Sequence, residues 1–89
     1  MRRRSSIFDH NKKYKEIGYN ISYYRKHANL TQEQLAELVG ISRSHMSAIE
    51  APNVNRKVSM ELVFDFAEVL HIEPYKLIKE HDQWLLNMK

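Results

Sequence analysis

Near the middle of the chain, a short segment combines one long cationic side chain with small polar ones. If residues 43–50 form a helix, its apolar positions Met46 and Ile49 face inward, and four residues remain on the outer face. These outward residues are Arg43, Ser44, Ser47 and Ala48. Because none of them is a bulky apolar group, the helix could enter the major groove of a nucleic acid duplex without obstruction.

No catalytic or metal-binding pattern accompanies this segment. The five histidines are not paired at i, i+4 spacing on one helix and form no His-Glu-x-x-His motif. They are His10, His27, His45, His71 and His81. The chain also has neither a Gly-rich phosphate loop nor a nucleophile elbow. We therefore expect no enzyme activity, no metal site and no cofactor.

The composition favours one small all-α domain. The chain has 89 residues, of which 43% are hydrophobic and 28% charged, so a compact core is feasible. Only two Gly and two Pro are present, too few for the frequent turns of a sheet protein. The absence of cysteine and of a long uncharged apolar stretch predicts a cytoplasmic chain without a membrane span.

Charge is divided unevenly along the sequence. Residues 1–57 hold eleven Lys and Arg against five acidic residues, whereas residues 58–89 hold three against six. A basic N-terminal part indicates a polyanionic partner on that side, through neutralisation of phosphates.

Hydrophobic spacing and capping residues predict five helices. Apolar residues recur every three or four positions from Tyr14, which predicts a first helix ending near Asn29. Thr31 and Gln34 form a capping box for a second helix, which should end at Gly40.

The remaining three helices follow from similar boundary residues. Ser42 should cap a helix over residues 43–50, and Pro52 should stop it. Ser59 should cap a fourth helix, and Pro74 begins a fifth whose apolar spacing continues to the C-terminus. The predicted organisation is a flexible basic arm over residues 1–12, a helical domain over 13–79 and a helical extension over 80–89.

The second and third predicted helices are joined only by Gly40, Ile41 and Ser42. Ala36 supplies a small side chain where the two helices approach each other, and Gly40 supplies the turn. This arrangement is a helix-turn-helix.

The sequence here resembles the lambda-repressor-like, or xenobiotic-response-element type, helix-turn-helix family. The resemblance covers residues 17–78. The matching residues are Ile17-Gly18, Ile21, Arg25, Leu30 through Ala36, Gly40-Ile41-Ser42, Met46, Ile49-Glu50, Ala67 and Leu70. It implies a five-helix domain that binds double-stranded operator DNA, usually as a homodimer on a palindromic site, and so a transcriptional regulator, with repression as its expected mode.

The resemblance also implies roles for individual residues. Arg43, Ser44, Ser47 and Ala48 correspond to base-reading positions, and arginine can pair bidentately with guanine. Gln32 corresponds to a phosphate-anchoring glutamine. The other expected phosphate ligands are Ser42, His45, Asn53, Asn55, Arg56 and Lys57.

Arg25 and Glu50 match a family pair that forms a structural ion pair between the first and third helices. Two departures from the family pattern occur nearby. Ala51-Pro52 stands where a glycine usually follows the glutamate, and Val58-Ser59 where a proline usually precedes the cap. The intervening loop is about two residues longer than usual, which leaves its individual DNA contacts open.

Two other functions are compatible with this reading. The chain could be the antitoxin of a toxin–antitoxin pair that represses its own operon, with the toxin as a protein partner. It could instead be an adaptor that keeps the fold and binds a protein through Tyr19, Tyr23 and the segment Trp84-Leu85-Leu86.

Both termini leave alternatives open. Trp84, Leu85 and Met88 could form a dimer contact or pack on their own domain. Arg2, Arg3 and Arg4 could enter a minor groove or remain a solvated tail.

Overall fold

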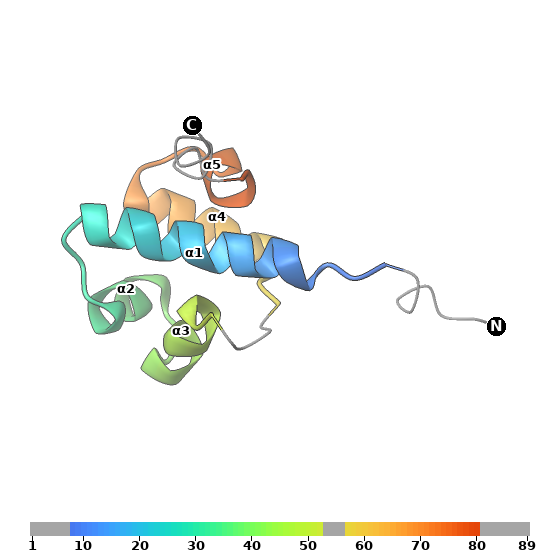
Figure 1. Cartoon of the computed structure of the whole chain (residues 1–89). Helices are drawn as coiled ribbons and strands as arrows, with labels where there is room; N and C mark the ends of the chain where they lie inside the picture. Colours follow the sequence, from blue (N-terminus) through green and yellow to red (C-terminus); the bar gives the residue numbers. More distant parts are fainter. Residues whose placement is uncertain (1–7, 53–56, 81–89) are drawn as a thin grey trace, which may run out of the picture.

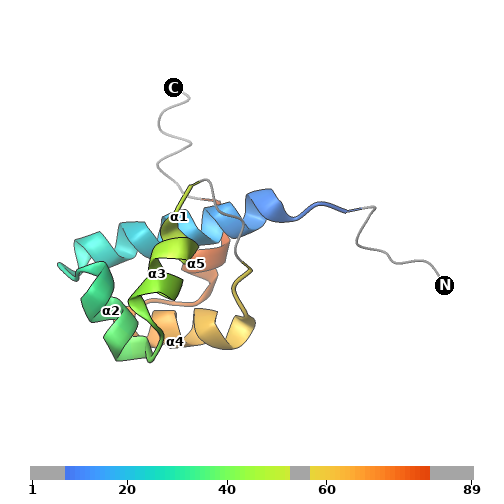
Figure 2. The ribbon, with the colours of Figure 1, turned by 90° about the horizontal axis from the view of Figure 1, so that it is seen from below.

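The computed structural model describes residues 8–52 and 57–80, which form five helices and no strand. The helices are α1 (Asn11–His27), α2 (Gln32–Val39), α3 (Arg43–Glu50), α4 (Met60–Leu70) and α5 (Tyr75–Ile78). The long α1 crosses the molecule, with α2 and α3 on one side of it and α5 on the other (Figure 1). The view turned by 90° shows α4 along the opposite edge of the molecule from α1, next to α2 (Figure 2). The all-α prediction is confirmed.

All five helices contribute to one core. Its fully buried apolar side chains are Ile21, Leu35, Met46, Val63, Phe66 and Leu77. Buried apolar residues recur every three or four positions along α1, α3 and α4, so each of these helices buries one stripe. No described helix combines the length and the hydropathy needed to cross a membrane.

Local side-chain hydrogen bonds begin three of the helices. The Thr31 hydroxyl accepts from the Gln34 backbone N–H at 3.0 Å while the Gln34 side chain accepts from the Thr31 N–H at 2.8 Å, which confirms the predicted capping box. Ser42 and Ser59 each accept a hydrogen bond from the backbone three residues later. These caps satisfy N–H groups that have no partner inside the helix.

A left-handed residue follows α1, α2 and α4. Asn29, Gly40 and His71 have φ angles of 61°, 81° and 59°. In each case the next residue donates its N–H to a carbonyl five positions back, which closes the helix end. This closure ends α1 at His27, slightly before the predicted end near Asn29.

The start of α1 corrects the predicted arm. The helix begins at Asn11, so residues 11 and 12 of the predicted flexible basic arm belong to α1. The Asp9 carboxylate accepts the Asn11 backbone N–H at 3.0 Å, which satisfies one of the free donors and lets the helix begin earlier. Arg2, Arg3 and Arg4 lie outside the described residues.

The end of the chain holds a second correction. The predicted fifth helix continues through residue 80, but α5 ends at Ile78 and Lys79 is extended, with φ −73° and ψ 162°. The buried Asn20 amide donates to the carbonyls of Leu77 and Lys79, at 2.9 and 2.8 Å. These contacts hold the two carbonyls in a non-helical arrangement. The rest of the predicted extension, including Trp84, Leu85 and Met88, lies outside the described residues.

Candidate nucleic-acid interface

The outer face of α3 consists of the residues predicted to read bases. Arg43, Ser44 and Ser47 are exposed and Ala48 is half-buried, whereas Met46 and Ile49 point into the core. The apolar positions thus fix the rotation of α3 about its axis. Its polar flank is left accessible along one side of the molecule.

The beginning of α3 favours an anion or a polar edge. Ser42 is its N-cap, and its hydroxyl accepts the His45 backbone N–H at 3.0 Å. The backbone N–H groups of Arg43 and Ser44 have no acceptor within the helix, and the helix dipole makes this end electropositive. Ser42 is exposed and the His45 residue is half-buried. Ser42 directly precedes Arg43 and His45 follows it by two residues, so both lie at the same end of α3 as Arg43.

The turn between α2 and α3 depends on Gly40. Its φ of 81° lies in the left-handed region, where a side chain is strained, and its N–H bonds to the Ala36 carbonyl at 2.8 Å. Ala36 is almost completely buried at this junction. The small residue and the left-handed turn together let two eight-residue helices pack closely at an angle.

Arg25 and Glu50 meet between α1 and the end of α3. The Arg25 Nε donates to Glu50 Oε2 at 2.8 Å, and Nη2 donates to Oε1 at 3.0 Å. Only 10% and 5% of the two side chains is exposed, so water screens the charges little. Arg25 Nη1 also donates to the Leu30 carbonyl at 2.7 Å, which attaches the connection between α1 and α2 to the same pair.

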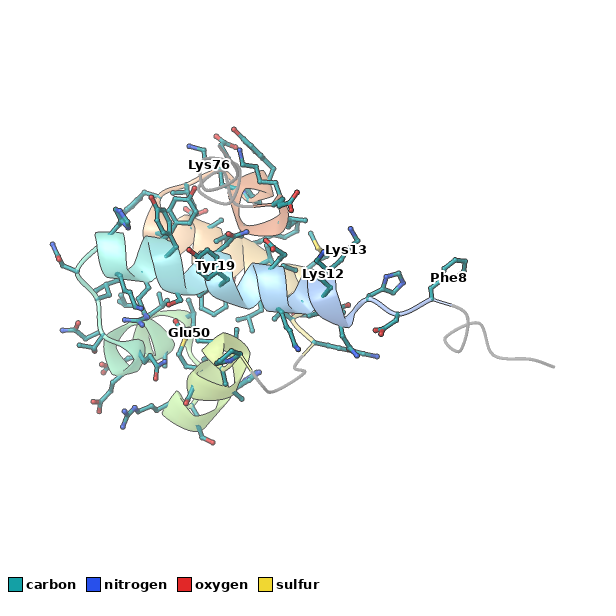
Figure 3. The ribbon with its side chains drawn as sticks, viewed as in Figure 1. Phe8, Lys12, Lys13, Tyr19, Glu50 and Lys76 are labelled. Atoms are coloured by element: carbon teal, nitrogen blue, oxygen red, sulfur yellow. The ribbon has the colours of Figure 1, made fainter. Side chains whose placement is uncertain are left out.

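Gln32 joins this ion pair, a contact that sequence reasoning missed. Its Nε2 donates to Glu50 Oε1 at 2.9 Å. Gln32 is the first residue of α2, and Glu50 is the last residue of α3. The predicted phosphate ligand and the predicted structural pair are therefore parts of one network beneath α1, where Figure 3 labels Glu50.

Gly18 was part of the family resemblance, but its physical role emerges only from the packing. A Cβ atom added at Gly18 would collide with the backbone carbonyl oxygen of Ile49. Because that atom belongs to the backbone, no side-chain rotation can relieve the clash. Glycine inside an amphipathic helix lowers helix stability by about 1 kcal/mol relative to alanine. A glycine at such a position is therefore a signal in the sequence that another part of the chain packs closely there.

The loop before α4 is described only in part. Lys57 is exposed, and Val58 is buried in the core. The predicted phosphate ligands Asn53, Asn55 and Arg56 lie outside the described residues. Of the four phosphate ligands predicted in this loop, Lys57 is thus the one that lies within the described residues, and it is on the surface.

The tyrosines considered for a protein contact lie on α1. Tyr19 is exposed and is labelled on α1 in Figure 3. Tyr23 is half-buried and packs edge-on against Tyr24, and its ring centroid lies 4.2 Å from that of His27. Trp84 and its neighbours lie outside the described residues, so the predicted adaptor surface can be described only in its α1 part.

A family model described as helix-turn-helix (HTH_3) matches residues 21–77, more than half of the chain. The HTH-type transcriptional regulator SinR of Bacillus licheniformis is 31% identical over 67 residues, which cover 75% of this chain and 60% of that protein. The chain thus spans about 60% of the length of this relative.

Two solved structures are similar in fold. The restriction-modification controller protein C.AhdI from Aeromonas hydrophila shares 33% identity with a TM-score of 0.70, over 79% of this chain and 99% of that chain. A hypothetical transcription factor, NHTF, from Neisseria gives a TM-score of 0.74 at 23% identity, over 91% of this chain and 89% of that one. The second likeness concerns the fold alone.

Proposed function

Because the chain belongs to the lambda-repressor-like helix-turn-helix family of DNA-binding transcriptional regulators, which are not enzymes, we propose that it represses transcription by binding operator DNA through α3. In this proposal α3 enters the major groove and the start of α2 contacts the phosphate backbone. The observation that carries the proposal is the orientation of α3, which buries Met46 and Ile49 and leaves Arg43, Ser44 and Ser47 accessible.

Base reading is assigned to the outward residues of α3. The guanidinium of Arg43 presents a planar pair of donors that match guanine O6 and N7. Ser44 and Ser47 can donate or accept hydrogen bonds at base edges, and the Ala48 methyl can contact a thymine methyl. Arg43 is therefore the main determinant of sequence preference in this proposal.

Phosphate contacts flank the reading helix. Gln32, Ser42, His45 and Lys57 supply side-chain donors around α3, and Asn53, Asn55 and Arg56 extend the same set by sequence. Contacts of this kind set the register of the protein on the duplex without reading a base. They also make affinity depend strongly on salt, because each neutralised phosphate releases counterions.

We further propose that two copies bind one palindromic operator. Two-fold symmetry would place two α3 helices in successive major grooves on one face of the duplex, about 34 Å apart. A bound repressor would then exclude the transcription machinery from the promoter. An antitoxin function would add a toxin as a protein partner to the same DNA-binding activity, whereas an adaptor would bind protein without retaining DNA.

Selection of bound fragments from random duplexes, at stated salt concentrations, tests the proposal. We expect enrichment of a palindrome with a guanine at a fixed position in each half-site. Recovery of unenriched sequences by a folded protein would contradict the proposed base reading. Repression is tested separately, by placing the selected site within a reporter promoter and measuring transcription with and without the protein.

A further inference from the structure

The geometry points to Glu50 as the residue that positions the Gln32 amide to bind a DNA phosphate, an inference that rests on the proposed function. Glu50 is the ion-pair partner of Arg25. Its carboxylate also contacts the first residue of α2, so it connects the ion pair to a predicted DNA contact.

The Glu50 carboxylate is held in one position by three hydrogen bonds. Oε2 accepts from Arg25 Nε, and Oε1 accepts from both Arg25 Nη2 and Gln32 Nε2. Arg25 is itself fixed, because it belongs to α1 and also donates to the Leu30 carbonyl. With 5% of its side chain exposed, Glu50 has little freedom to exchange these partners for water.

A carboxylate in this position determines which end of the Gln32 amide faces inward. The ionised carboxylate can only accept hydrogen bonds, so it binds the NH2 end of the amide and disfavours the carbonyl end. The NH2 group has two N–H donors, and one remains after Glu50 has taken the other. A phosphate oxygen also only accepts, so the orientation set by Glu50 is the one that keeps a donor on this nitrogen for the duplex.

Without Glu50 the amide could rotate and present its carbonyl oxygen, which repels a phosphate. Gln32 is half-buried at the beginning of α2, where the helix dipole also favours a negative group. Fixing a donor before binding lowers the ordering cost of the contact. Glu50 therefore acts on DNA through Gln32 and is a positioning residue.

The test removes the charge of one phosphate at a time. Operator duplexes carrying a single methylphosphonate at successive positions are titrated with wild type and with Gln32→Met, which keeps the side-chain length and removes the N–H donors. At the phosphate bound by Gln32, neutralisation should weaken wild-type binding about tenfold or more, because one charge-assisted hydrogen bond is lost. Neutralisation of the same phosphate should leave the affinity of Gln32→Met unchanged.

Glu50→Gln should lose sensitivity at that same phosphate and keep it at the others. Glu37→Gln, an exposed acid on α2, is the matched control and should behave as wild type. If Glu50 merely supported the fold, Glu50→Gln would weaken binding equally at every position and keep full sensitivity at the Gln32 phosphate, which would overturn the inference.

Two further outcomes keep the result interpretable. If circular dichroism shows that Glu50→Gln does not fold, Glu50→Asp carries the test, because it retains the charge opposite Arg25 while withdrawing the carboxylate from Gln32. If wild type shows no position-specific effect and no preference for the selected duplex, the proposed function fails. If wild type shows both, but the folded Glu50 variant keeps full sensitivity at the phosphate that Gln32 binds, only the positioning role fails.

Discussion

Gly18 of α1 lies directly against the backbone carbonyl of Ile49, one residue before the end of α3. The absence of a side chain at this point lets the long helix approach the predicted reading helix to backbone contact. A second contact between these two helices reinforces the approach, because Arg25 of α1 forms an ion pair with Glu50 of α3. The orientation of α3 is thus set from α1 as well as from α2.

Replacing Gly18 by alanine should separate α1 from α3. We expect a loss of about 1–3 kcal/mol in the free energy of unfolding, as for other overpacked core positions, despite the better helix propensity of alanine. Urea unfolding measures this loss. Lys15→Ala, an exposed change on the same helix, should leave stability near that of wild type. A Gly18→Ala protein as stable as wild type would show that the contact is easily relaxed.

Arg43→Ala should cost about 1–3 kcal/mol of binding free energy and relax the preference at one base pair of each half-site. The reason is that an exposed guanidinium at the start of α3 can pair with a guanine edge. Lys76→Ala removes the same charge on α5, on the opposite side of α1 from α3 (Figure 3), and serves as the control. Site selection with both variants checks the result, and an unchanged motif for Arg43→Ala would refute its base-reading role.

Lys57→Ala should weaken binding to all duplexes alike. An exposed lysine in the segment that leads into α4 is expected to neutralise a phosphate without contacting a base, so its removal should reduce the slope of log affinity against log salt by about one. Titrations at several salt concentrations, with specific and random duplexes, provide the measurement. A change confined to the specific duplex would instead make Lys57 a sequence reader.

Asn20→Leu should destabilise the fold by about 1–3 kcal/mol, because it leaves the carbonyls of Leu77 and Lys79 without their amide donor. Leucine has a similar size, so loss of packing contributes little. Asn11→Leu, at the exposed first residue of α1, should have little effect. Thermal and urea unfolding compare the two, and the base preference of the folded Asn20→Leu protein should match wild type.

Sequence reasoning predicted the parts of the fold that depend on near neighbours. The caps at Thr31, Ser42 and Ser59 each use a partner three residues away, and Gly40 meets a local demand for a left-handed turn. Such interactions are encoded within one helical turn, so the observed bounds of α3 agree with the prediction. The outward set of Arg43, Ser44 and Ser47 followed from helical periodicity alone.

Other features depended on contacts between residues far apart in the chain. Asn20 donates to carbonyls 57 and 59 positions later in the chain. These carbonyls lie at the end of α5, where apolar spacing predicts a continuing helix. The contact between Gln32 and Glu50 crosses 18 positions, and the requirement for Gly18 follows from a backbone atom of another helix. Periodicity identifies which face of a helix is buried but not which atom it meets. Only the packing of the helices decides that.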